Sequence, residues 1–227
     1  MNPKRLLDNE AAQRSAVYAI LSRAFLKEPD LELIRFLKSG RIREILESLD
    51  LSLGDDFPEK DEASLIEELS LEYARLFLTP PSHLPPCESF YVGGLQDDME
   101  NFEPFLQGKA ADEVRTFYRE HGILMPEETG VFPDHIGVEL EALRLLCELE
   151  SMAIDSGRPD RVRQLRRITG NFLNEHPKRW MLLFSELILK KAEKPFYRVI
   201  AQLTRAFIDS ELAELSHCRV EEEEVIL

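Results

Sequence analysis

Apolar side chains in this chain recur every three to four residues, which is the spacing of one face of an α-helix. The pattern fills seven segments, residues 11–26, 62–78, 111–121, 134–153, 160–174, 177–192 and 195–215. No stretch alternates between apolar and polar residues long enough to predict a strand, and no Asn-Gly or Asp-Gly hairpin turn occurs. The fold class is therefore expected to be all-α.

Glycine and proline lie between these segments and leave mostly short connections, which favour antiparallel packing of neighbouring helices. A chain of 227 residues is most simply one domain. We therefore expect residues 1–227 to form a single-domain helical bundle. The block of like charges from Glu221 to Glu224 predicts that residues 219–227 form a flexible acidic tail.

The net charge of -15 argues against a nucleic-acid partner, because affinity for phosphates depends on lysine and arginine. A field of this sign steers a cationic partner instead, such as a basic peptide. The longest nearly apolar run, residues 180–189, contains Glu186. A membrane-spanning helix needs roughly 20 apolar residues, so no membrane span is expected.

Three widely spaced cysteines, Cys87, Cys147 and Cys218, include no Cys-x-x-Cys pair, and no secretory signal precedes them. We expect them to be reduced thiols and the protein to be cytoplasmic.

A proline-rich segment from Pro80 to Pro86 precedes Glu88, Ser89 and Tyr91. Prolines stiffen the backbone, so these side chains would lose little entropy when they bind a partner. The structural alternative is that Phe90 and Tyr91 pack the loop onto the bundle while Ser89 caps a turn. Both interpretations hold together if one aromatic ring is packed and the acid and hydroxyl are exposed.

A second polar group, Asp134 and His135, follows Pro133 at the start of a long helical pattern. The Asp134 carboxylate is predicted to cap that helix and to complement its dipole. A cation is disfavoured at this end of a helix, so His135 should be neutral. Gly137, in the first turn, is expected to let another chain approach the backbone closely.

His135 and Glu139 lie four residues apart, a spacing that places two metal ligands on one helix face. The chain offers no matching third and fourth ligand, because His83 and Cys87 lie among prolines. We therefore expect no metal site and no cofactor. No nucleophile elbow, phosphate-binding loop or dinucleotide fingerprint is present, so we do not expect an enzyme.

The order of these motifs is distinctive. A tyrosine and a Leu-Phe pair precede the prolines, then come Glu-Ser-x-Tyr at residues 88–91 and Asp-His at residues 134–135. This order resembles the TorD/DmsD/NarJ family of cytoplasmic chaperones that mature redox enzymes. Residues 172–180 and 196–197 are similar to later helices of that family.

The resemblance implies a chaperone that binds the N-terminal signal, of twin-arginine type, of a molybdenum-containing oxidoreductase subunit. It further implies help with cofactor insertion before the client is exported. The peptide-binding residues would be Asp134, His135, Glu88, Ser89 and Tyr91, with Glu139 as an addition. Such a signal has a basic start and an apolar middle, so its receptor needs acidic side chains beside an apolar groove.

Two alternatives remain at this point. One is a NarJ-type assembly factor for a membrane-bound molybdoenzyme that is not exported. The other is a metal-dependent enzyme that uses His135 and Glu139. A monomer and a homodimer both fit the sequence.

Overall fold

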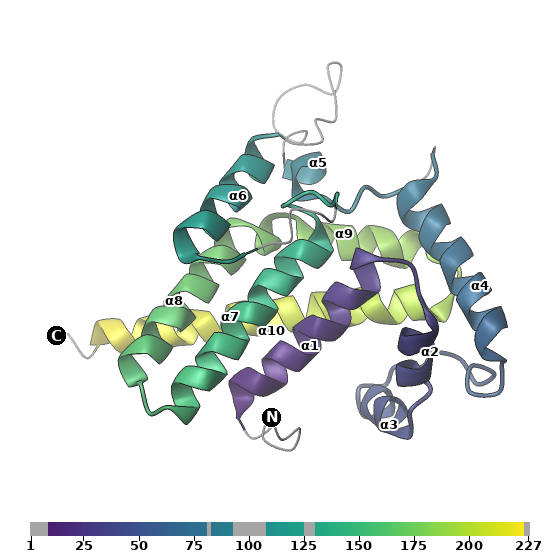
Figure 1. The fold of residues 1–227 in the computed structure, drawn as a ribbon, viewed down its shortest axis with the longest axis horizontal. Coiled ribbons are helices and arrows are strands. Elements are labelled where there is room, and N and C mark those ends of the chain that lie inside the picture. Colours follow the sequence, from purple (N-terminus) through teal and green to yellow (C-terminus); the bar gives the residue numbers. More distant parts are fainter. Residues whose placement is uncertain (1–8, 81–82, 93–107, 125–129, 225–227) are drawn as a thin grey trace.

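The computed structural model describes residues 9–80, 83–92, 108–124 and 130–224. These residues form helices and no strand, which confirms the all-α prediction (Figure 1). The elements are α1 (Glu10–Leu26), α2 (Leu31–Leu37), α3 (Gly40–Ser48), α4 (Glu62–Tyr73), the π-helix η2 (Ala74–Leu78), α5 (Glu88–Val92), α6 (Lys109–His121), α7 (Ile136–Asp155), α8 (Pro159–Glu175), α9 (Pro177–Lys191) and α10 (Pro195–Glu224).

The seven predicted helical segments correspond in order to α1, to α4 together with η2, and to the five helices α6, α7, α8, α9 and α10. Helices α2, α3 and α5 were not predicted, because helices of 7, 9 and 5 residues are too short to show a clear period. Helix α10 continues to Glu224, beyond the expected end at residue 215. Residues 225–227 and the side chain of Cys218 lie outside the described part, so a flexible tail stays a prediction.

Helices α1 and α7 pack along each other, α8 packs against α7, and α9 packs against α10 (Figure 1). Their facing sides carry large aromatic rings, each of which removes a large apolar area from water. The largest fully buried side chains include Trp180, Tyr18, Tyr197, Phe25, Phe172, Phe184 and Phe196. Helices α2, α3 and α4 lie at one side of this bundle, and α5 and α6 lie at one end (Figure 1).

A buried network of charges crosses the bundle around Arg14 of α1. Its guanidinium lies 3.1 Å from Glu150 of α7 and 2.7 Å from Glu211 of α10. Arg166 of α8 adds a second cation 2.7 Å from Glu150, and the Tyr18 hydroxyl donates to Glu211 at 3.0 Å. The Glu150 and Glu211 side chains are 0% and 3% exposed, so the network joins four helices in the interior.

Cys87 and Cys147 are buried and form no disulfide. None of the helices in the described ranges has an apolar stretch long enough to cross a membrane.

Candidate functional site

The two polar motifs meet in space. The Glu88 backbone N–H donates to the Asp134 carbonyl at 2.9 Å, and the Ile136 N–H donates to the Pro86 carbonyl at 2.8 Å. These bonds form an isolated antiparallel bridge between Cys87 and His135. The bridge fixes the start of α5 against the start of α7, so the side chains of both motifs lie in one cluster.

The helix cap at this junction differs from the prediction. Asp134 does not cap α7: its Oδ2 atom accepts from the Ser89 N–H at 2.9 Å, in the first turn of α5. His135 is the N-cap of α7, and its Nδ1 atom accepts from the Gly137 N–H at 3.0 Å. An aspartate beside a helix start can serve a neighbouring helix, and only the tertiary arrangement decides which one.

The imidazole of His135 is neutral at neutral pH, as predicted. Burial lowers its pKa to about 4, because the charged form would lose its hydration. A neutral ring keeps Nδ1 unprotonated, so that nitrogen can accept the hydrogen bond from the first turn of the helix.

Three carboxyl groups of the cluster, those of Glu88, Asp134 and Glu139, are completely buried. The expectation that the acid and the hydroxyl of the proline-rich segment are exposed is therefore wrong, since Ser89 is also buried. The reason is tertiary: α5 packs against both α6 and α9, and these helices cover its polar side chains.

Glu139 is completely buried beside Trp180 of α9. One carboxyl oxygen accepts from the Trp180 indole N–H at 3.2 Å, and the other accepts no hydrogen bond from a described residue. Burial, followed by the nearby Glu88 carboxylate, raises the pKa of Glu139 well above its ordinary value. A neutral carboxyl is the form that this environment favours.

Glu88 has two basic side chains as neighbours, His176 between α8 and α9 and Arg179 of α9. The His176 Nδ1 atom lies 2.9 Å from Glu88 Oε2, and an Arg179 nitrogen lies 3.3 Å from Oε1. The contact of Arg179 is a charge contact without hydrogen-bond alignment, because Oε1 accepts no hydrogen bond from the described residues. The same guanidinium reaches Glu113 of α6 at 3.7 Å.

Tyr91 and Ser89 have mainly structural surroundings. The Tyr91 ring stacks on Trp180 with centroids 5.5 Å apart and contacts Phe184 at 5.7 Å. This confirms that Tyr91 packs the loop onto the bundle. The predicted capping by the Ser89 hydroxyl is wrong, because the hydroxyl makes no hydrogen bond with described residues and the Ser89 N–H is the bonded group.

Gly137 serves a close approach within the chain rather than by another chain. A Cβ atom at this position would lie 2.6 Å from Leu26 Cγ and 3.1 Å from the Leu26 backbone nitrogen. The Ser22 hydroxyl donates to the Gly137 carbonyl at 2.8 Å. Glycine therefore lets the end of α1 touch the start of α7, which holds the cluster in place.

A groove of about 660 Å³ lies beside the cluster, between α6 and the junction of α8 with α9. His176 and Arg179 line it and separate it from Glu88. Its other lining residues are Lys109, Asp112, Glu113, Thr116, Phe117, Glu120 and Glu175. The groove thus combines one largely buried aromatic ring, that of Phe117, with several carboxylates, and none of its residues was predicted as part of the site.

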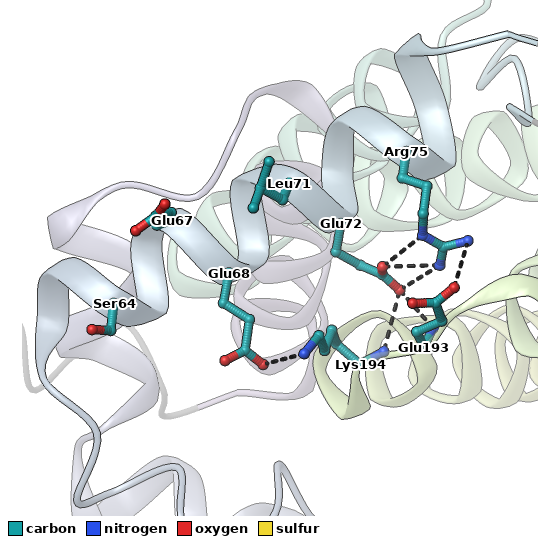
Figure 2. A pocket seen from close by; sticks show the side chains of 8 residues that line it. All are labelled: Ser64, Glu67, Glu68, Leu71, Glu72, Arg75, Glu193 and Lys194. Carbon is teal, nitrogen blue, oxygen red and sulfur yellow. Dashed lines mark hydrogen bonds and ion pairs between the residues drawn. The ribbon is translucent and has the colours of Figure 1, made fainter.

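A second hollow, of about 370 Å³, lies between α4 and the turn from α9 to α10 (Figure 2). Here Glu72 accepts from the Glu193 N–H at 2.6 Å, and Arg75 pairs with Glu72 and donates to the Lys191 carbonyl at 2.8 Å. These bonds satisfy the end of α9 and the start of α10. The charged groups of this hollow therefore join three helices, which makes it a weaker candidate for a binding site.

The described acids and histidines at these two places are not arranged as a set of metal ligands. No group of three or more His, Cys, Asp or Glu side chains in the described ranges is arranged to hold a metal ion. His135 Nδ1 is used in capping, and Glu139 is bonded to Trp180. Burial also raises the pKa of the Cys87 thiol well above its ordinary value, so it is a poor ligand and nucleophile.

Comparison with known proteins gives relatives over most of the chain. It is 25% identical to the perchlorate reductase assembly chaperone protein of Dechloromonas aromatica, covering 91% of this chain and 92% of that one. It is 28% identical to the chaperone protein TorD of Photobacterium profundum, over 65% of this chain and 64% of that one.

A crystal structure of a redox enzyme maturation protein from Archaeoglobus fulgidus, described there as putative, is also similar. It shows 25% identity and a TM-score of 0.48, with 86% of this chain and 91% of that chain covered. The sequence profile of the nitrate reductase delta subunit family matches residues 37–186, which include both polar motifs, the groove and most of α9. The match extends over more than half of the sequence, and the chain belongs to the nitrate reductase delta subunit family.

Proposed function

We propose that this protein is a cytoplasmic chaperone for the assembly of a molybdenum-containing oxidoreductase. In this proposal it binds the N-terminal, twin-arginine-type signal of the catalytic subunit and assists cofactor insertion before export. Two relatives are named as an assembly chaperone and as TorD, which supports a role in binding rather than in catalysis. The protein itself needs no cofactor for this role.

The observation that carries the proposal is the groove between α6 and α9. Its carboxylates, Asp112, Glu113, Glu120 and Glu175, suit the basic start of a signal peptide, and Phe117 suits its apolar middle. The volume of about 660 Å³ accommodates several side chains of a peptide. A net charge of -15 would attract a cationic segment over a longer range.

The six residues predicted from sequence keep a place in this proposal. Glu88 is the nearest to the groove, because its two neighbours His176 and Arg179 line it. Asp134, His135, Ser89, Tyr91 and Glu139 lie behind it and fix the start of α5 and of α7. We propose that they shape the wall of the groove.

Calorimetric titration with a peptide that carries paired arginines and an apolar stretch tests the proposal. The double variant Glu120→Gln/Glu175→Gln should bind more weakly and should show a smaller loss of affinity with added salt. The matched control is Glu44→Gln/Glu67→Gln, which removes the same charge from α3 and α4, away from the groove. Equal effects of both pairs would contradict the groove as the binding surface.

Asp134→Asn tests the buried cluster separately. Asparagine keeps an oxygen that can accept from the Ser89 N–H, so α5 should stay in place while the charge of Asp134 is lost. We expect weaker peptide binding with an unchanged helical circular dichroism spectrum. Unchanged affinity would remove Asp134 from the site.

A second function is favoured by the description of the family itself, which names a nitrate reductase subunit. An assembly factor of the NarJ type would use the same surface on a client that stays in the cytoplasm. Capture of the client from its own cell extract, followed by sequencing of its N-terminus, distinguishes the two: an exported client carries a twin-arginine signal, and a retained one does not.

A further inference from the structure

Arg179 holds an unusual position at the groove. Its side chain is 40% exposed and lines the hollow, yet its guanidinium lies 3.3 Å from a glutamate that is completely buried. On its other side the same group is 3.7 Å from Glu113, at the opposite wall. One cation of the chain itself therefore lies between the buried carboxylate of Glu88 and the open space.

We propose that Glu88 and Glu113 form a guanidinium-binding site, which Arg179 fills in the free protein and an arginine of the partner occupies after displacing it. The nature of the partner rests on the proposed function, whereas the site itself does not. Arg179 is then an internal competitor, and its removal should strengthen the binding of an arginine-bearing peptide.

The fit of Arg179 to Glu88 is incomplete, which makes the exchange feasible. Glu88 Oε1 is fully buried and accepts no aligned hydrogen bond, although the guanidinium is close. A guanidinium that enters with better geometry could donate two parallel bonds to the carboxylate. Glu113 is also paired with Lys109 at 3.2 Å, but that lysine side chain is 90% exposed, so the pair competes weakly.

The exchange also avoids a large energetic penalty. A buried carboxylate without a cation is strongly destabilising, so Glu88 cannot simply release Arg179 to open the groove. When one guanidinium replaces another, the charge next to Glu88 stays the same throughout. His176, 2.9 Å from the other oxygen, remains in place during the replacement. The site should therefore prefer arginine over lysine, whose ammonium lacks the planar fork.

Chemical rescue tests the site without any peptide. The variant Arg179→Ala leaves the pocket of the guanidinium empty, and Lys178→Ala is the matched control, because it removes an exposed cation from the preceding position of the same helix. Methylguanidinium at about five times its dissociation constant would shift the folding equilibrium about sixfold and raise Tm by about 2 to 4 °C.

We expect this rise in Arg179→Ala and not in Lys178→Ala or the wild type. Methylammonium should give a smaller rise in Arg179→Ala. Equal shifts in both variants, or none in either, would overturn the proposed site. If Arg179→Ala does not fold, Arg179→Gln is used, since its neutral side chain is shorter by two bonds and leaves the position of the guanidinium open.

Peptide titration tests the competition. Arg179→Gln should bind a peptide with paired arginines about tenfold more tightly than the wild type. This factor corresponds to an interaction energy between that of an exposed charge pair and that of a buried one. Replacing both peptide arginines by lysines should remove most of this gain. If the wild type binds the peptide and Arg179→Gln binds it no more tightly, the proposal that Arg179 competes with the peptide is wrong. A wild-type protein that does not bind the peptide at all would instead contradict the proposed function, and the rescue experiment would still decide the site.

Discussion

The free energy of unfolding of Glu139→Gln should increase relative to that of the wild type as the pH rises. The Glu139 carboxyl is fully buried, and burial together with Glu88 raises its pKa well above the ordinary value. Glutamine has nearly the same shape and can still accept from the Trp180 indole N–H, but it carries no titratable proton.

The magnitude follows from proton binding in the two states. An unfolded glutamate loses its proton near pH 4.3, whereas the folded carboxyl keeps it to a higher pH. Over the range between these two pKa values, the folded state holds one more proton than the unfolded state. The protonated Glu139 carboxyl makes its full contribution to the free energy of unfolding below about pH 4.3. Above that pH the contribution falls by about 1.4 kcal/mol per pH unit until the folded pKa is reached.

Urea unfolding of the wild type and Glu139→Gln at a series of pH values measures this slope. The difference between their free energies of unfolding should grow in favour of the variant, by about 1.4 kcal/mol for each unit above about pH 5, until the folded pKa is reached. Glu120→Gln, an exposed change on α6, is the control and should follow the wild type. A constant difference above pH 5 would mean that Glu139 is already ionised in the folded protein and would refute the reasoning.

Two further predictions concern buried groups. The free energy of unfolding of the wild type should fall by about 1.4 kcal/mol per pH unit between about pH 6.5 and pH 4, because His135 binds a proton in the unfolded chain but not in the folded protein. His135→Asn keeps a helix cap and should lack this loss. Urea unfolding at pH 6.5 and pH 5 checks this, and equal acid losses would count against it. Arg14→Ala should lower the free energy of unfolding by about 3 to 5 kcal/mol, because Glu150 and Glu211 lose a partner inside the protein. Arg115→Ala, at a 54% exposed side chain, should cost less than about 1 kcal/mol, and similar losses in both would show that the buried network contributes little.

The long helices were predictable because each repeats its apolar period over several turns. Short helices such as α5 give no such signal, and their presence depends on packing. The sequence also singled out Glu88 and Asp134, since polar residues beside prolines and helix starts are conspicuous. It did not indicate that both are buried, because burial depends on which distant segment covers a side chain.

The groove shows the same limit more clearly. Glu113 and Arg179 come from α6 and α9 and look like ordinary charges on the surface of amphipathic helices. Only the packing of α5 against those helices brings Arg179 to the buried carboxylate of Glu88, and Glu113 contacts Arg179 from the other side. The prediction of the α7 cap was wrong for a related reason. Asp134 and His135 are adjacent, and Asp134 accepts from the first turn of α5 whereas His135 caps α7.

The charges around Arg14 also determine how far α1 can slide along α7. Apolar side chains are a poor guide to register, because another apolar residue follows about one turn later on the same face. A shift of one turn, about 5.4 Å, would carry the guanidinium away from Glu150 and Glu211 and leave both carboxylates unpaired in the interior. The network therefore acts against misaligned packing, and it fixes the end of α1 where Leu26 meets Gly137. In this way a polar contact at one end of the helix pair sets the position of the buried carboxyl cluster at the other.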